Sequence, residues 1–367
     1  MNRRLEAVRT QLDSLFEGFF DWLEGQYDPS TGGFYYARSS QKSGRFEPDI
    51  ESTAQAYNII ERCGLLRLLD EPMTAQAVRF FQSKQDAASG YFYDADPHMR
   101  LDEVMVGRAI SYSTGALRRF GAAPLFPLPN ERDAAPDYIA TPEAYGRWLR
   151  SISLANSWRG CDRLCNSAPY LAQMSAERRE PYLKEALDYF DRIQDPDTGL
   201  WGEGSWYVRL SGTFKLHTFY GRFRVEMPRL REMYRSLLHT LRSEEAVDMC
   251  YIRNPISLLA AMKLRPSPEE WLEIAEITVR NMTRLRRGDG GFSRELAHSP
   301  AAPNVAQVKQ GEHYPDMPHP VRLGLGEVEG DMNAGTQAIL IRSLLHSLAG
   351  LEPEPLKAPA DWFARYR

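Results

Sequence analysis

The sequence is poor in cysteine for its length. Its 367 residues include four, namely Cys63, Cys161, Cys165 and Cys250. This excludes the disulfide scaffold of a small secreted protein, so we expect four reduced thiols in a cytoplasmic protein. Neither sign of charge is in large excess, because 45 Lys and Arg residues stand against 49 Asp and Glu residues, a formal net charge of −4. This balance does not favour nucleic acid as a partner, since that requires a basic excess.

Long apolar runs are also absent. No run approaches the roughly 20 residues of a membrane span, and the N-terminal residues lack the apolar segment of a secretory signal. We therefore expect no integral membrane segment and a cytoplasmic location. The sequence contains no phosphate-binding glycine loop, dinucleotide-binding glycine motif, His-Glu-x-x-His pair or nucleophile elbow, nor an Asp-Asp-x-x-Asp run. The composition, 43% hydrophobic and 26% charged, is that of an ordinary globular protein.

A short repeat is the main feature that the sequence does contain. An aromatic residue is followed four residues later by Gln, then by a turn rich in Asp, Pro and Gly, and then by a second aromatic residue. Copies occupy 22–34, 81–92 and 190–201, and a degraded copy at 288–292 follows Arg286. Residues at i and i+4 share one helix face, and Asp and Gly end helices in turns. The repeat therefore predicts helix ends onto which the second aromatic residue folds back.

Between these turns the chain has helical periodicity and no convincing strand. Twelve predicted helices form six pairs, and the second helix of each pair begins near a polar residue. The first helices are predicted at 4–24, 72–87, 142–154, 176–193, 228–242 and 267–286, and the second helices at 50–63, 103–119, 157–174, 211–222, 247–263 and 332–348. Six helical hairpins can close into a double-layered ring. We therefore predict an all-α fold in one domain, residues 1–367: an (α/α)6 toroid, or barrel, with the second helices inside.

The long connectors all lead into the predicted inner helices. They span about 25–49, 88–102, 195–210 and 287–331, whereas the return connectors are short. Functional residues tend to lie on long loops held by a rigid scaffold. We therefore expect the inner-helix N-termini and the long loops on one face, with the active site there and the longest connector as a lid.

The block Phe190–Trp201 resembles the QW repeat of squalene cyclases and protein prenyltransferase β-subunits, which form α6/α6 toroids. This resemblance implies a terpenoid cyclase or prenyltransferase-like enzyme that binds an isoprenoid in its central cavity. Other α6/α6 enzymes, including glycoside hydrolases that act on unsaturated uronic sugars and some sugar epimerases, carry turns like that at 195–201. A carbohydrate-active glycoside hydrolase, lyase or epimerase for uronic-type sugars is therefore the alternative. A non-catalytic binding toroid is a second one.

Residues 48–54, Pro-Asp-Ile-Glu-Ser-Thr-Ala, are similar to the Asp-x-Asp-Asp-Thr-Ala acid motif of class II cyclases. The resemblance places Glu51 at the proton donor, and Ser52 replaces the last Asp. Such a donor is a carboxylic acid kept protonated in an apolar cavity. Asp49 and Ser52 would equally serve to cap a helix, with Glu51 in its first turn.

The segment 248–251, Asp-Met-Cys-Tyr, is similar to the Asp-x-Cys-Tyr segment that supplies two zinc ligands in prenyltransferase β-subunits. The third ligand in that family is a His on the last inner helix, just after an Asp-x-x, where this chain reads Asp331-Met332-Asn333-Ala334 and has no His. A stable zinc site needs three or four ligands, so we do not expect Zn2+ unless His313 or His319 supplies one.

Carboxylates recur where the predicted inner helices begin. The candidate catalytic acids and bases are Asp49, Glu51, Asp248 and Asp331. Paired carboxylates suit glycoside hydrolysis and could also bind Mg2+, although acids at helix N-termini also complement the helix dipole. No cofactor is predicted firmly.

The stretch 201–217 and the longest connector supply the candidate substrate-binding residues. A Lys215 inside the ring would be a costly desolvated charge unless it met an anion such as a carboxylate or diphosphate. The candidates are Trp201, Trp206, Tyr207, Lys215, His217 and His313. The sequence identifies no protein partner, and we expect a small-molecule substrate.

The lining of the inner helices separates the hypotheses. An apolar, aromatic cavity would favour an isoprenoid, whereas a polar cleft with facing carboxylates would favour a sugar. The predicted inner helices are mixed, since Tyr57, Met105 and Phe214 accompany Arg108 and Lys215.

Overall fold

The computed structural model describes residues 2–131, 136–262, 264–306 and 317–366. Within these ranges the chain is almost entirely helical, and its one sheet pairs two strands of two residues each, β1 (Tyr27–Asp28) and β2 (Gly33–Phe34). The predicted all-α class is thereby confirmed. None of the helices in the described ranges combines the length and the apolar character needed to cross a membrane.

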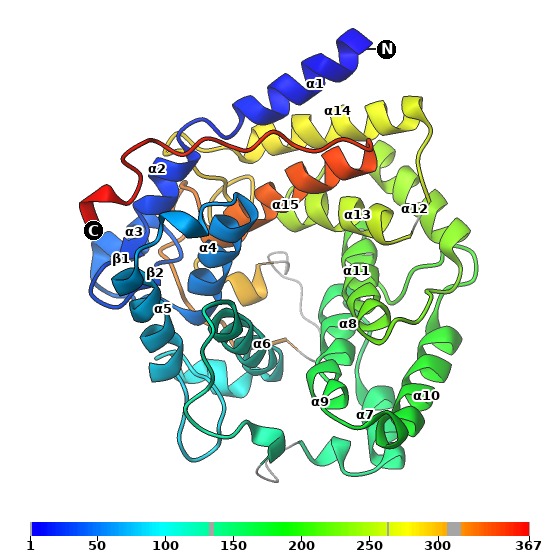
Figure 1. The fold of residues 1–367 in the computed structure, drawn as a ribbon. Coiled ribbons are helices and arrows are strands. Elements are labelled where there is room, and N and C mark those ends of the chain that lie inside the picture. The colour runs from blue at the N-terminus through cyan, green and yellow to red at the C-terminus, as the bar shows by residue number, and fades with distance from the viewer. Residues whose placement is uncertain (1, 132–135, 263, 307–316, 367) are drawn as a thin grey trace.

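Six helices form a closed cycle of contacts around the centre of Figure 1, each packing against the next and the last against the first. We call them the inner helices: α4 (Ile50–Arg62), α6 (Glu103–Arg119), α8 (Ser157–Cys165), α11 (Trp206–Phe223), α13 (Met249–Ala261) and α15 (Met332–Leu348). They correspond to the six second helices that the sequence predicts.

The remaining long helices lie outside this cycle in Figure 1. They are α1 (Asn2–Ser14), α5 (Glu71–Ser83), α7 (Pro142–Ser151), α10 (Ala176–Ile193), α12 (Leu230–Ser243) and α14 (Pro268–Leu285). Helix α5 packs against α6, α12 against α11, and α14 against α13, α15 and α1, while α10 packs against α7.

Shorter helices occupy the connectors. Those of α type are α2 (Phe19–Glu24), α3 (Arg38–Ser43) and α9 (Ala168–Ala172). The 3-10 turns are η1 (Leu66–Leu68), η2 (Pro97–Leu101), η3 (Pro129–Glu131), η4 (Asp137–Ile139), η5 (Pro303–Val305) and η6 (Ala364–Tyr366). The sequence analysis misses α3 because its six residues, Arg-Ser-Ser-Gln-Lys-Ser, have no apolar periodicity.

Each inner helix begins after a polar residue whose side chain accepts a hydrogen bond from a backbone N–H of the first turn. These caps are Asp49, Asp102, Asn156, Ser205, Asp248 and Asp331. All except Ser205 are buried. The caps satisfy amides that no intrahelical partner can reach, and they fix where each inner helix starts.

Three predicted helix boundaries are wrong. Helix α11 begins at Trp206 rather than at residue 211, because Ser205 caps it. The predicted helix 4–24 is broken at Gly18, whose φ of 71° is left-handed. The predicted helix 157–174 ends at Cys165 and resumes as α9, where Pro169 in the first turn has no N–H to continue α8.

The repeat folds as the sequence predicts in its most complete copy. The Trp201 indole is fully buried and donates its Nε1–H to the Phe190 carbonyl oxygen at 2.8 Å. The Gln194 side chain donates to the Gly199 carbonyl oxygen at 2.8 Å. The second aromatic residue therefore returns to the helix end, while the Gln closes the turn.

The other copies differ in what the residue at the Gln position contacts, and in the first copy the Gln26 side chain donates to the Trp22 carbonyl oxygen at 2.7 Å. Gln85 donates to the Gly90 carbonyl oxygen at 3.1 Å, as Gln194 does to Gly199. In the degraded copy Arg286 replaces the Gln and donates to the Gly291 carbonyl oxygen at 3.3 Å. The second aromatic residues of all four copies are fully buried, namely Phe34, Phe92, Trp201 and Phe292.

The first prediction concerns the turn glycine. Gly199 has a φ of 69°, and a Cβ on it would lie 2.7 Å from the backbone nitrogen of Met233. Gly199→Ala should lower the free energy of unfolding by more than about 1–2 kcal/mol, the cost of a left-handed L residue alone. Urea unfolding followed by circular dichroism measures the change.

Gly221→Ala is the matched control. Gly221 lies in α11, and a Cβ there would meet no atom within 4 Å. Alanine should therefore raise the free energy of unfolding by up to about 1 kcal/mol. Equal effects of the two substitutions would contradict the role assigned to the Gly199 turn.

Candidate functional site

A cavity of about 310 Å³ lies inside the cycle of inner helices and receives side chains from all six of them. We call it the central cavity. Its amides are Gln55, Asn58, Asn254, Asn333 and Gln337. Its cationic side chains are Arg62, Arg108, Lys215, Arg253 and Arg294. Aromatic surface comes from Tyr112, Trp158 and Phe214. The lining is thus mainly polar and cationic, with aromatic patches.

A second hollow of about 370 Å³ adjoins the central cavity and shares Arg108 and Tyr112 with it. Its exposed lining residues include Thr218 and Arg222, near the C-terminal end of α11. Arg62, at the C-terminal end of α4, is likewise exposed. The exposed lining of the two hollows therefore lies toward the C-terminal ends of the inner helices.

At the opposite end, the caps form a buried hydrogen-bonded layer with the long connectors. Arg294 is 4% exposed, and its Nε donates to Asp248 at 3.2 Å while its backbone N–H donates to Asp331 at 2.6 Å. Its guanidinium also donates to the Pro303 carbonyl oxygen at 2.6 Å. This arginine therefore joins the caps of α13 and α15 to the connector that covers them.

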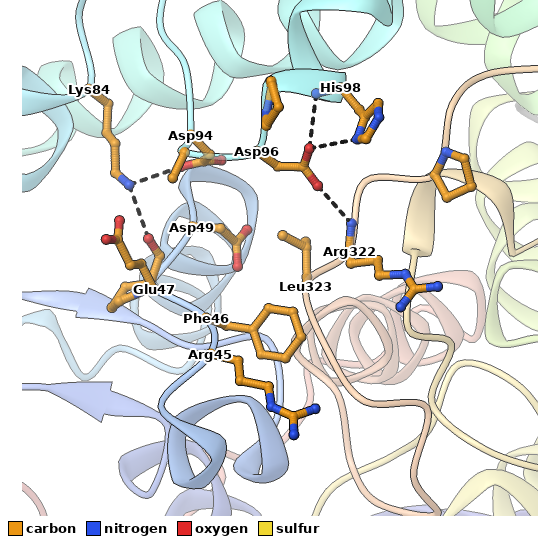
Figure 2. A pocket seen from close by; sticks show the side chains of 14 residues that line it. Arg45, Phe46, Glu47, Asp49, Lys84, Asp94, Asp96, His98, Arg322 and Leu323 are labelled. Carbon is orange, nitrogen blue, oxygen red and sulfur yellow. Dashed lines mark hydrogen bonds and ion pairs between the residues drawn. The ribbon is translucent and has the colours of Figure 1, made fainter.

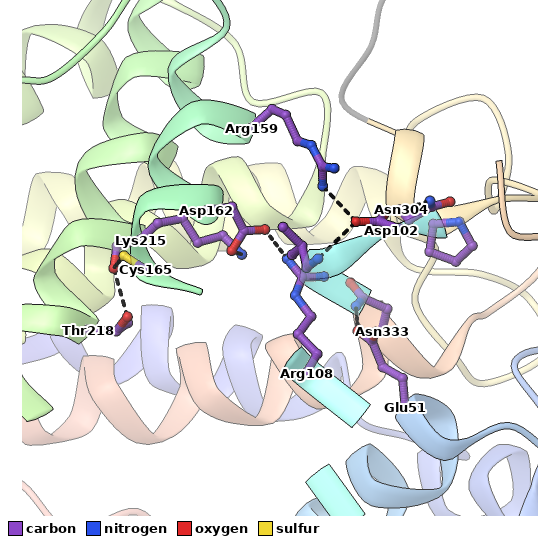
Figure 3. Close-up of polar contacts among 12 residues, drawn as sticks. Glu51, Asp102, Arg108, Arg159, Asp162, Cys165, Lys215, Thr218, Asn304 and Asn333 are labelled. Carbon is purple, nitrogen blue, oxygen red and sulfur yellow. Dashed lines mark hydrogen bonds and ion pairs between the residues drawn. The ribbon is translucent and has the colours of Figure 1, made fainter. Parts of the chain in front are cut away.

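Asp102 anchors the same layer on the other side of the ring (Figure 3). Its carboxylate accepts from Arg159 at 3.1 Å and from Asn304 at 3.2 Å, and it also caps α6. Asn304 in turn accepts from the Val321 N–H at 3.0 Å. Residues far apart in the sequence thus close over the N-terminal ends of the inner helices.

Two of the predicted catalytic carboxylates, Asp248 and Asp331, belong to this layer. Asp248 accepts from the Cys250 N–H and from Arg294. Asp331 accepts from Ala334, Ser299 and Arg294. Burial raises the pKa of Asp331 to about 6. Neither residue is among those that line the central cavity.

Glu51 does reach the central cavity. Its Oε1 accepts hydrogen bonds from Gln55 at 3.0 Å and from Asn333 at 3.3 Å, and the residue is half-buried (Figure 3). Burial opposes the charge on Arg108, but Asp162 and Glu51 raise its pKa, and burial together with Glu51 raises the pKa of Tyr112. Glu51, Arg108 and Tyr112 therefore belong to one electrostatic group. Glu51 is therefore a carboxylate held toward a cationic cavity by two amides.

Lys215 also faces this space, on α11, and it meets an anion as its burial requires. Its Nζ lies 3.2 Å from Asp162, and the same carboxylate contacts the Arg108 guanidinium (Figure 3). Burial opposes the charge on Asp162, but Arg108 and Lys215 together hold its pKa below the usual value. Burial and Arg108 lower the pKa of Lys215. One carboxylate thus serves two cations.

Asp49 lies in a different hollow of about 490 Å³, beside the N-terminal end of α4, which we call the rim pocket (Figure 2). One Asp49 oxygen accepts from the Ser52 N–H at 2.8 Å, while the buried Oδ2 has no partner among the described residues. Asp94 accepts from the Ile50 N–H at 3.1 Å and pairs with Lys84 at 3.2 Å. Burial and the neighbouring Asp94 raise the pKa of Asp49 to about 8.

The predicted aromatic residues serve packing and lie apart from these hollows. Trp201 is buried in the repeat turn. Tyr207 is buried and stacks on Tyr251 with ring centres 5.1 Å apart. Trp206 is half-buried in contact with the His239 ring, at 4.8 Å. None of the three lines the central cavity or the rim pocket.

The candidate histidines and metal ligands do not converge in the described part of the chain. His217 contacts the Phe214 carbonyl oxygen of its own helix, and burial lowers its pKa. His313 falls outside the described residues. Cys250 lines the central cavity with a pKa raised by burial. Among the described residues, no three His, Cys, Asp or Glu side chains gather closely enough to hold a metal ion.

The sequence analysis misses Asp162 and Arg253. Asp162 is flanked by Arg159 and Arg163, so it looked like part of an ordinary charged helix. Arg253 carried a usable signal, because it is the only charged residue of the apolar helix Met249–Ala261. A single charge in such a helix indicates either a buried pair or a site.

The second prediction concerns Asp49. Its pKa is about 8 in the folded chain and about 3.9 when unfolded, so between these values only the folded state keeps the proton. Folding stability contributed by this group is therefore lost as pH rises through that range. Asp49→Asn, which still caps a helix, should gain stability relative to the wild type as pH rises. Urea unfolding at several pH values measures this.

Asp195→Asn is the control with the opposite electrostatics. Burial opposes the charge on Asp195, but hydrogen bonds from Thr198 and Asp197 lower its pKa. The stability difference caused by this substitution should therefore be constant above pH about 4. If Asp49→Asn also gave a constant difference, the buried, protonated state of Asp49 would be refuted.

Comparison with known proteins does not identify a family for this chain. No family model matches the chain, and no curated protein matches it significantly.

Proposed function

We propose that the chain is an (α/α)6 toroid of six helical hairpins, as the QW-like repeat implies. The closed contact cycle of α4, α6, α8, α11, α13 and α15 supports this architecture. Two further features support it: the inner helices carry caps at their N-terminal ends, and the other long helices lie outside the cycle in Figure 1. In this arrangement a cavity on the ring axis is the natural place for a small ligand.

We infer that the toroid is a carbohydrate-active enzyme that binds a sugar in the central cavity. The observation that carries this proposal is the lining, in which five amides and several charged groups surround Trp158 and Phe214. A sugar presents hydroxyl groups to such donors and acceptors and its C–H faces to aromatic rings.

The same lining gives less support to the isoprenoid hypothesis. A polyprenyl chain gains affinity by burying apolar surface, and it would leave the amides of the central cavity without partners. The described lining includes a single aliphatic side chain, Leu340, besides the aromatic residues.

Glu51 is the proposed acid–base group. It is the carboxylate that lines the central cavity, whereas Asp162 adjoins it in a complex with two cations. The amides of Gln55 and Asn333 orient Glu51 without neutralising it. A positioned carboxylate of this kind can take or give a proton at a sugar oxygen or carbon. Hydrolysis, elimination and epimerisation all need such a step.

The third prediction tests this role. Purified protein is incubated with panels of neutral and uronic oligosaccharides, and products are identified by mass spectrometry. Glu51→Gln should lower the turnover of an active substrate by roughly 100-fold to 10,000-fold, the usual contribution of a general acid or base. Geranylgeranyl diphosphate is included in a parallel binding experiment, and saturable binding of it without sugar turnover would favour the isoprenoid hypothesis instead.

Glu61→Gln is the matched control. Glu61 lies on the same helix but is exposed and pairs with Arg119 at 2.9 Å. Its substitution should leave turnover within about twofold, because exposed ion pairs contribute little. Full activity in Glu51→Gln would remove Glu51 from the mechanism.

A further inference from the structure

The central cavity holds more positive charge than its carboxylates can balance. Among the described residues, the half-buried Arg108, Lys215 and Arg253 and the exposed Arg62 line it, against the carboxylate of Glu51 and that of the adjoining Asp162. Arg294 is not part of this excess, because Asp248 pairs with it in the rim layer. Buried charge is expensive unless it is paired, so the excess needs a physical reason.

Arg253 is where the imbalance is sharpest. Its guanidinium lies over the Phe214 ring, 4.0 Å from the centroid, and one terminal nitrogen donates to the amide oxygen of Asn254 at 3.0 Å. Its Nε is buried and has no acceptor, and no carboxylate pairs with Arg253 among the described residues. Burial and the neighbouring Arg62 and Arg108 lower its pKa, because they disfavour the positive charge of the guanidinium itself.

The carboxylates near Arg253 are engaged elsewhere and do not balance its charge. Asp162 is shared between Arg108 and Lys215 and is already in contact with both. Lys215 also lies over the Trp158 ring at 5.7 Å. Glu51 is turned toward the amides of α4 and α15. The protein therefore brings cationic groups from α6, α11 and α13 to one cavity and supplies too few anions for them.

We propose that Arg253, together with Arg108 and Lys215, forms a binding site for an oxyanion group, a carboxylate or a phosphate, carried by the ligand of the central cavity. This inference rests on the proposed function, since it names the charged group of the ligand that the same cavity takes. A planar guanidinium with free N–H groups suits such oxygens, because it can donate two parallel hydrogen bonds. A neutral ligand would leave the charge of the half-buried Arg253 without a compensating anion among the described residues.

The fourth prediction compares three probes by isothermal titration calorimetry on the full chain: D-glucuronate, D-glucose and inorganic phosphate. Glucuronate should bind roughly tenfold or more tightly than glucose, the value of one hydrogen bond to a charged group. Arg253→Gln should remove that advantage. The matched control is Arg242→Gln, at an exposed pair with Glu273, which should keep it.

The outcomes separate this inference from the proposed function. Phosphate binding that needs Arg253, without binding of either sugar, would support the oxyanion site and contradict the carbohydrate function. Equal binding of glucose and glucuronate, unaffected by Arg253→Gln, would overturn the oxyanion site and leave the carbohydrate function standing. Absence of binding by all three probes to the folded protein would overturn the oxyanion site.

A ligand-free measurement tests the same charge independently. Because the Arg253 charge is uncompensated, Arg253→Gln should leave the thermal unfolding midpoint unchanged or raise it in the absence of ligand. Arg242→Gln should leave it unchanged or lower it slightly, because it loses an exposed ion pair. A clear fall in the midpoint of Arg253→Gln would show that the guanidinium is already stabilised and would contradict the proposal.

Discussion

The organisation of this chain depends on how its six inner helices begin. A polar side chain before each one accepts a hydrogen bond from the first turn, and five of these six caps are buried. Buried carboxylates need donors, and the connectors provide them through Arg294 and Asn304. The polar side chains at the N-terminal ends of the inner helices are therefore used for capping and for hydrogen bonds to the connectors. The exposed lining of the central cavity lies toward the C-terminal ends.

The charged side chains of the central cavity are balanced less completely than those at the capped N-terminal ends of the inner helices. At the rim the buried carboxylates Asp102 and Asp248 are matched by Arg159 and Arg294, whereas Asp49 keeps one oxygen without a partner among the described residues. Among the residues that the structure describes, cations outnumber anions in the central cavity, and the Nε of Arg253 has no hydrogen-bond acceptor. Since unpaired buried charge costs stability, a cluster that keeps it is a candidate for function, where such costs are commonly tolerated.

The candidate site was predicted only in part, and the reason is specific to each residue. Glu51 is a sequence candidate through its resemblance to the class II cyclase acid motif, and Lys215 through its position on a predicted inner helix, and both line the central cavity. Asp248 and Asp331 were indistinguishable from Glu51 in sequence, because an acid at a helix start serves equally as a cap or as a catalyst. Asp162 escaped because its partners come from other helices, which no local pattern encodes. Arg253 could have been found from the sequence, because it is the single charge of an apolar helix.

The sequence by itself determined the helical class, the repeat turns and the positions of the inner helices, since these depend on side-chain periodicity, caps and glycine conformations within a few residues. Tertiary structure alone decided which polar groups are satisfied. Whether Asp49 keeps a proton depends on burial beside Asp94, and whether Lys215 is balanced depends on an Asp162 that Arg108 already uses. Both outcomes depend on electrostatic interactions among charges that folding brings together. Such interactions weaken with distance in space and not with separation along the chain.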